Sequence, residues 1–132
     1  MSSQPQAEPA QAQAEPPPGL VIVRGRGVQS ELAFAGLTRK VHAYNPRLML
    51  TEHVMEAGSV FPRHSHPHEQ LAYLVSGRIV VACGGYTFEA VAGDSFIVQG
   101  GIDHQVTALE RSVALDIFTP MREDYLNPSQ PR

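Results

Sequence analysis

The sequence predicts an all-β protein of one domain, a sandwich or barrel built from many short strands. From residue 20 onward, short apolar runs alternate with turn residues at close intervals, which is typical of such folds. No segment carries a long apolar repeat of about 3.6 residues, so helix beyond a single turn is not expected. The length of 132 residues fits one domain.

The apolar runs expected to form strands are separated by Asn-Pro, Ser-Gly, Gly-Gly and Gly-Asp steps that mark turns. They cover residues 20–24, 37–43, 48–55, 70–75, 78–82, 87–91, 95–98, 104–109 and 113–118. Residues 31–34 and 122–126 each fit a short helical turn. The run 113–118 is apolar on both parities, which predicts a strand covered on one face by the barrel interior and on the other by a second sheet or subunit.

Both ends of the chain are expected to lie outside the folded domain. Residues 1–19 hold mostly Gln, Ala, Pro and Glu with few large apolar side chains, which predicts a disordered tail. Residues 127–132 are expected to fray. The predicted domain therefore spans residues 20–126.

Composition excludes several classes of partner. A net charge of −3 gives no electrostatic reason to bind nucleic acid, and no apolar run is long enough to cross a membrane. The N-terminus lacks the layout of a secretion signal. Cys83 is the single cysteine, so no internal disulfide forms and a cytoplasmic location is expected. Its place before Gly84 and Gly85 favours inert packing at a strand end over a nucleophilic role.

A histidine-rich segment predicts a metal site. His64, His66 and Gln70 are spaced by two and then four residues, so they share one face of an extended segment. His68 has the same parity but follows the rigid Pro67. His104, after a Gly-Gly turn, supplies a distant fourth donor. Imidazole and amide ligands suit one divalent ion of nickel, zinc, iron, manganese or cobalt. The alternative for Gln70 is a hydrogen bond to a ligand histidine rather than to the ion.

The same segment resembles the first cupin motif, in which a glycine is followed by His-x-His, an acid and a second glycine at fixed spacing. Gly58, His64, His66 and Gly77 match, and Gln70 stands where most cupins carry glutamate. The resemblance implies the cupin double-stranded β-helix, a jelly-roll barrel.

The second cupin motif is present in a degraded form. Gly93, Gly101 and His104 match it in register, whereas Gln99 replaces its proline and Ala108 its asparagine. Together the two motifs cover the chain from about residue 48 to residue 118.

A narrower resemblance links the chain to the pectin-degradation cupins. It rests on the string H-S-H-P-H-E-Q and on the late string L-D-I-F-T-P-M-R-E-D-Y-L. Those proteins help convert unsaturated uronates, released by pectate or alginate lyases, into linear keto-uronates. The resemblance implies that Gln70 is the fourth metal ligand and that Asp116 and Phe118 lie over the metal on the final strand.

Residue chemistry gives roles to the late string as well. Asp116 is a lone acid on an apolar strand, where burying an unpaired charge costs free energy. Two roles would offset this cost: Asp116 could be an acid beside the metal that moves a proton, or it could form an ion pair with an arginine. Phe118 shares its parity and could be plain core. Arg122 could grip a substrate carboxylate as a fork, or pair with an acidic neighbour. Arg39 and Arg63 are weaker candidates.

These observations favour a metal-dependent enzyme that opens or tautomerises unsaturated uronates, and they leave two alternatives open. One is a metal-dependent oxygenase of a small organic substrate. The other is a non-catalytic cupin that binds or senses a small anion. A uronate-like anion is the expected ligand, and nucleic acid and membrane are not expected partners. The resemblance to small cupins implies a homodimer, and the strands that are apolar on both faces agree with it.

Overall fold

The computed structural model describes residues 14–126, so the predictions for residues 1–13 and 127–132 lie outside the described residues. Between them the chain forms ten strands and two single-turn 3-10 helices, η1 (Gly25–Gly27) and η2 (Glu123–Tyr125). The strands are β1 (Glu31–Phe34), β2 (Leu37–Asn45), β3 (Leu48–Met55), β4 (Val60–His64), β5 (Glu69–Ser76), β6 (Arg78–Cys83), β7 (Tyr86–Val91), β8 (Ser95–Val98), β9 (His104–Ala108) and β10 (Ser112–Thr119). The all-β prediction is confirmed.

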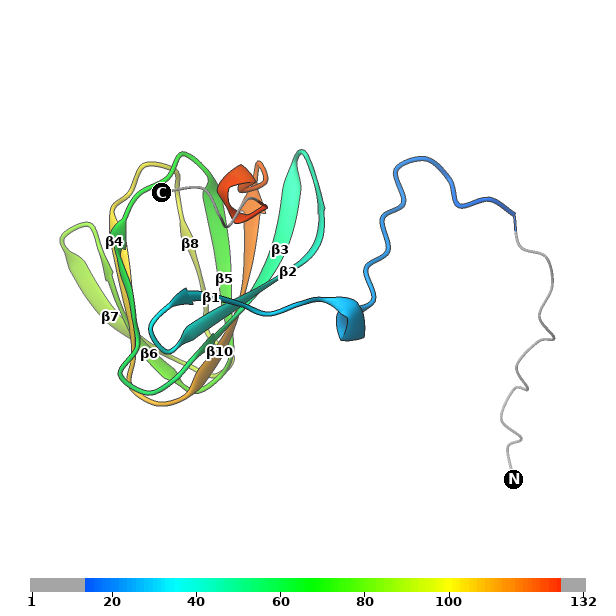
Figure 1. Ribbon diagram of the computed structural model, residues 1–132. Helices are drawn as coiled ribbons and strands as arrows, with labels where there is room; N and C mark the ends of the chain where they lie inside the picture. Colours follow the sequence, from blue (N-terminus) through cyan, green and yellow to red (C-terminus); the bar gives the residue numbers. More distant parts are fainter. Residues whose placement is uncertain (1–13, 127–132) are drawn as a thin grey trace, which may run out of the picture.

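The strands form two antiparallel sheets that face each other across the core (Figure 1). The larger sheet has six strands in the order β1-β2-β3-β10-β5-β8, and the smaller has four in the order β4-β9-β6-β7. Strands β4 and β5 are consecutive in sequence but belong to different sheets, so the chain between them crosses from one sheet to the other. The histidine-rich segment is that crossing.

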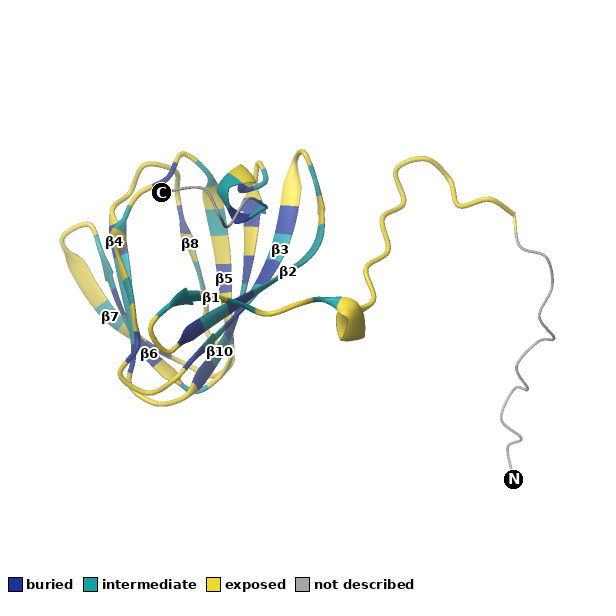
Figure 2. Ribbon diagram, viewed as in Figure 1, coloured by how far each residue is buried: buried dark blue, intermediate teal, exposed yellow. Residues whose placement is uncertain are grey.

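Alternating side chains build the core between the sheets. Along β3 every second residue is buried, from Met49 to Met55, and the burial colouring follows the same inward-facing pattern (Figure 2). Leu37, Leu74, Val81 and others from both sheets form one apolar cluster, against which Cys83 packs. The expected packing role of Cys83 agrees with this position.

Local turn chemistry ends the hairpins where the sequence predicts. The Asn45 side-chain oxygen accepts hydrogen bonds from the backbone nitrogens of Arg47 (2.8 Å) and Leu48 (3.0 Å), which closes the β2–β3 turn. Gly77, between β5 and β6, has a φ of 93°, and a side chain there would collide with Ser112. These turns fix the strand register and hence which residues face inward.

Two predictions about the N-terminal part of the domain were wrong. Residues 20–24 form no strand, because this segment leaves the barrel and pairs with none of its sheets (Figure 1). Residues 31–34 form strand β1 rather than a helical turn, because the Ala35-Gly36 turn folds them back onto β2. Strand β4 was not predicted. The predicted turn at residues 122–126 corresponds to η2.

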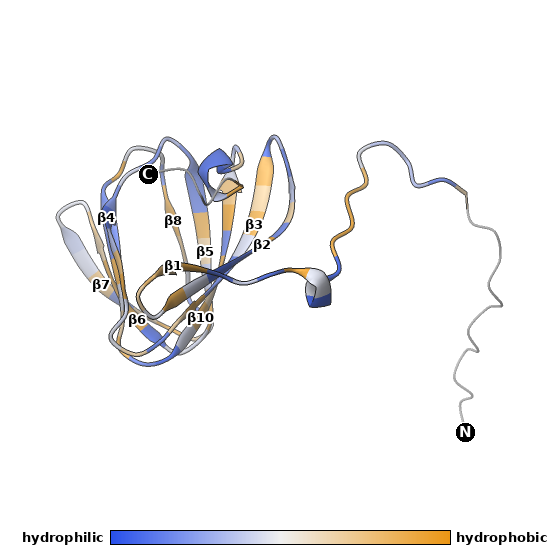
Figure 3. Cartoon of the chain, in the orientation of Figure 1, coloured by the Kyte–Doolittle hydropathy of each residue, from blue (hydrophilic) through white to orange (hydrophobic). Residues whose placement is uncertain are grey.

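The segment before η1 is apolar yet exposed. Leu20, Val21, Ile22 and Val23 are 41–58% exposed, and Figure 3 shows the segment coloured as hydrophobic. Separately, no helix within residues 14–126 is long and apolar enough to span a membrane.

Candidate metal centre

Three predicted histidine ligands meet at one end of the barrel. His64 ends β4 and His104 begins β9, and the antiparallel register places them opposite each other, with ring centroids 4.3 Å apart. His66 lies in the crossing segment, where its backbone oxygen accepts a hydrogen bond from the Gly101 nitrogen at 2.8 Å. One nitrogen from each ring lies within 4.8 Å of the others. Residues 40 positions apart in sequence thus converge on one point.

Backbone carbonyls fix the tautomer of all three rings. Each Nδ1 donates a hydrogen bond to a carbonyl oxygen two residues away: His64 to Pro62 (2.8 Å), His66 to His68 (3.0 Å) and His104 to Ile102 (2.8 Å). A neutral ring with its proton on Nδ1 presents a lone pair at Nε2, which is the form that binds a metal ion. The Nε2 of His104 is buried and has no hydrogen-bond partner among the described residues.

Burial also lowers the pKa of two of these rings, His64 and His66. The pKa of His66 is lowered from 6.5 to about 4, first by desolvation and then by the positive charge of Arg122. Desolvation likewise lowers the pKa of His64. Neutral rings near pH 7 have their nitrogen lone pairs available for an ion.

Gln70 turns its amide oxygen toward the histidine cluster. Its Nε2 donates a hydrogen bond to Asp116 Oδ1 at 2.9 Å, and a carboxylate only accepts, so Oε1 points the other way. There it lies 3.1 Å from Nε2 of His66, whose single proton is on Nδ1. Two acceptor atoms at this distance repel each other unless a cation lies between them. The donor set therefore fits a divalent transition metal.

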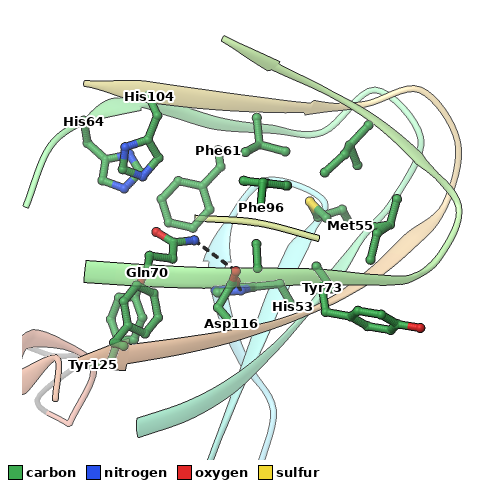
Figure 4. Close-up of a pocket in the computed structure, with 16 residues that line it drawn as sticks. His53, Met55, Phe61, His64, Gln70, Tyr73, Phe96, His104, Asp116 and Tyr125 are labelled. Atoms are coloured by element: carbon green, nitrogen blue, oxygen red, sulfur yellow. Dashed lines mark hydrogen bonds and ion pairs between the residues drawn. The ribbon is translucent and has the colours of Figure 1, made fainter. Parts of the chain in front are cut away.

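Asp116 lies next to Gln70, and the dashed line in Figure 4 marks the hydrogen bond between them. It is buried on β10 with Ala114 and Phe118 on the same inward face, as their shared parity predicts. Its Oδ2 accepts a hydrogen bond from His53 Nδ1 at 2.8 Å. The arginine expected as a partner of Asp116 does not contact it directly: His53 lies between them, and Arg39 donates to Nε2 of His53 at 3.1 Å.

His53 was missed by sequence reasoning, and Arg39 was given only a minor role. A signal was available in the strand pattern. His53 shares the parity of the buried Met49 and Met55 on β3, and Arg39 shares that of Leu37 on β2. Polar residues on the inward parity of adjacent strands are expected to be partners.

Two further candidates, Phe118 and Arg122, border an inner cavity and an outer groove, respectively. Phe118 is buried and its ring stands edge-on to His66 at 5.7 Å. Arg122 donates hydrogen bonds to Asp124 from Nε (3.0 Å) and Nη2 (2.8 Å). For these two nitrogens, the structure has the pairing with an acidic neighbour that was the alternative to binding a substrate carboxylate. The Nη1 of Arg122 is buried and has no hydrogen-bond partner among the described residues.

Two other candidates lie outside the donor set. The ring of His68 does not belong to the cluster, although its carbonyl oxygen orients His66. Arg63 forms an exposed ion pair with Asp103 at 2.7 Å. Neither needs to be invoked for metal binding.

The converging histidines separate two spaces. An outer groove of about 530 Å³ is lined by His64, His66, His68 and Arg122 among others. An inner cavity of about 40 Å³ is lined by His64, Gln70, His104 and Asp116 together with core residues (Figure 4). The groove could hold a sugar-sized molecule, whereas the cavity has room for about one water or a small substituent.

A two-sheet jelly roll with a histidine-rich donor set at one end defines a class of small barrel proteins. The chain belongs to the cupin family, since residues 51–118 match the family described as "Cupin domain". This confirms the predicted fold family.

Relatives refine the comparison. The chain is 31% identical over 93 residues to "Pectin degradation protein KdgF" of Dickeya dadantii, a match that covers 69% of this chain and 84% of that protein. The structure of KdgF from Halomonas sp. superposes with a TM-score of 0.75 at 29% identity and covers 80% of this chain and 99% of that one. An RmlC-like cupin from Shewanella frigidimarina gives 0.75 at 31% identity and covers 79% and 94%.

Proposed function

We propose that this protein is a metal-dependent cupin that opens unsaturated uronates to linear keto-uronates in pectin or alginate breakdown. The observation that carries the proposal is the donor set: the imidazoles of His64, His66 and His104 and the amide oxygen of Gln70, backed by the buried acid Asp116. Similarity to a pectin degradation protein supports the substrate class.

The ligands themselves bring no negative charge. A bound divalent ion would supply Lewis-acid stabilisation to a carboxylate and to the oxygen that becomes negative as the ring opens. The buried Nη1 of Arg122 faces no protein acceptor among the described residues and can add one hydrogen bond to that anion. A uronate carboxylate fits both requirements.

In the first step of the proposed reaction, Asp116 acts as a base. Both of its oxygens accept hydrogen bonds, from Gln70 and His53, which hold the carboxyl group in place. It takes a proton from the anomeric hydroxyl, directly or through one water in the inner cavity, while the bond from the anomeric carbon to the ring oxygen breaks. The products of this step are an aldehyde and an enolate. Return of the proton to the alkene carbon gives the ketone, so no co-reactant is consumed.

The test combines metal analysis with turnover. Purified protein should contain about one divalent ion per chain, and should remove the ultraviolet absorbance of lyase-generated unsaturated uronate in a metal-dependent way. His104→Ala should lose both properties. Metal-loaded protein that binds uronate without turnover would favour the anion-binding alternative. Oxygen uptake with an organic substrate would favour the oxygenase.

We also propose a homodimer formed through the outer face of the larger sheet. Leu71, Tyr73, Ile97 and Ile117 lie on this face and are 39–65% exposed. An exposed apolar surface of this kind on a folded domain favours association. The exposed segment 20–23 adds apolar surface that a second copy could cover.

A further inference from the structure

A row of polar side chains crosses the inner face of the larger sheet, where the neighbouring side chains are apolar. Glu31, Arg39 and His53 lie opposite one another on β1, β2 and β3. Asp116 on β10 and Gln70 on β5 continue the row toward the metal centre. We call these five residues the polar row.

Contacts connect every member of the row. Arg39 forms an ion pair with Glu31 at 3.6 Å and donates to Nε2 of His53 at 3.1 Å. His53 Nδ1 donates to Asp116 at 2.8 Å, and Asp116 receives a second hydrogen bond from Gln70 at 2.9 Å. The row is therefore a continuous connection from the edge of the sheet to Gln70.

Arg39 fixes the direction of both hydrogen bonds of His53. A guanidinium only donates and stays charged, so Nε2 of His53 must accept and its proton must reside on Nδ1. The carboxylate of Asp116 then accepts on both sides. Gln70 is left with one orientation, amide nitrogen toward Asp116 and amide oxygen toward His66.

From this we infer that Arg39 and His53 are positioning residues of the metal centre. They hold the Asp116 carboxylate in the place where its Oδ1 accepts from Gln70, so that Gln70 presents its oxygen to the ion. The inference rests on the metal site in the proposed function. The polar row is not a path for proton transfer, because the guanidinium of Arg39, which contacts His53, does not release its proton. If Arg39 and His53 only stabilised the fold, it would not matter which end of the Gln70 amide faces the ion.

Metal affinity in a double-mutant cycle tests the inference. His53→Phe keeps a ring in the space but removes both polar atoms, whereas His53→Asn retains a donor near the position of Nδ1. Zinc affinity, measured by competition with a chromophoric chelator, should fall by about tenfold to a hundredfold in His53→Phe. His53→Asn should recover most of the loss.

The Gln70→Ala background separates positioning from general damage. If His53 acts through Gln70, then His53→Phe should cause no further loss of zinc affinity once Gln70 is Ala. An undiminished loss in that background would overturn the inference, as would folded His53→Phe protein that binds zinc as tightly as the unmodified protein. Circular dichroism and urea midpoints establish that each variant is folded.

A spectroscopic measurement remains decisive even if His53→Phe fails to fold. In unmodified zinc-loaded protein, the imidazole nitrogens of His53 should report a proton on Nδ1 by nitrogen-15 NMR. A proton on Nε2 would overturn the inference. These readouts use zinc and not uronate, so an absence of uronate turnover would refute the proposed reaction without changing their meaning.

Discussion

Replacing Asp116 with Asn is expected to disturb the metal centre as well as the chemistry, because both oxygens of Asp116 accept hydrogen bonds. An Asn offers one acceptor, so its amide nitrogen must face a donor from either Gln70 or His53. His53 cannot easily exchange its tautomer, since Arg39 donates to its Nε2. The two facing donors can then be avoided only if the Gln70 amide rotates, which turns its oxygen away from His66.

The magnitudes follow from these contacts. A buried donor left facing another donor costs about 1–3 kcal/mol, which corresponds to about fivefold to 150-fold in an equilibrium constant. We therefore expect metal affinity to fall by about tenfold to a hundredfold. At saturating metal, turnover should still fall by at least about a hundredfold, because the proton-transfer group has been lost.

The assay must separate these two effects. Metal affinity is measured by chelator competition, and turnover of unsaturated uronate is followed by ultraviolet absorbance at saturating metal. Glu89→Gln is a matched control, since it neutralises an acid in an exposed ion pair with Arg78 on the other sheet. Near-normal turnover of metal-loaded Asp116→Asn would remove Asp116 from the mechanism. Unchanged metal affinity would refute the predicted rotation of Gln70.

Three further perturbations test the site and the assembly. Gln70→Glu should retain metal but bind anions more weakly, because it adds a negative charge to the site; unchanged anion affinity would argue against Gln70 as a ligand. Metal-free protein should lose stability to urea as the pH falls from 6.5 toward 4: the pKa of folded His66 is about 4, so the unfolded chain binds this proton first and acid favours unfolding. This slope should be shallower in His66→Asn, and equal slopes would contradict the assignment. Ile97→Lys on edge strand β8 should convert a dimer to a monomer in light scattering, whereas Leu32→Lys at the opposite edge should not; a monomeric unmodified protein would contradict the proposed interface.

Sequence pattern predicts most of the barrel because hairpin turns and alternation are local properties. The turn at Asn45 and the strands on either side of it need only neighbouring residues to be recognised. The segment 20–24 shows the limit of this reasoning. Its apolar β-branched residues fit a strand, but a strand also needs a partner edge, and the barrel supplies none to it.

The candidate site was predictable where its residues stand close together in sequence. His64, His66 and Gln70 are joined by parity along one segment, and His104 follows a turn signal. The link between Asp116 and His53 was not predictable in this way, because it depends on β3 and β10 being neighbours although 63 positions separate the two residues. Strand order is a long-range property that the local pattern does not contain.

Charge balance connects the polar row with the choice of ligand. The proposed ligands, three imidazoles and the amide of Gln70, bring no negative charge, whereas Glu31, Arg39 and Asp116 together leave one negative charge behind them. The charge of Arg122 is matched by Asp124. A divalent ion at the centre would thus keep one positive charge uncompensated in a partly desolvated place, and a single carboxylate on the ligand would neutralise it. A monoanionic sugar acid meets this requirement, whereas a neutral sugar would leave the charge unbalanced.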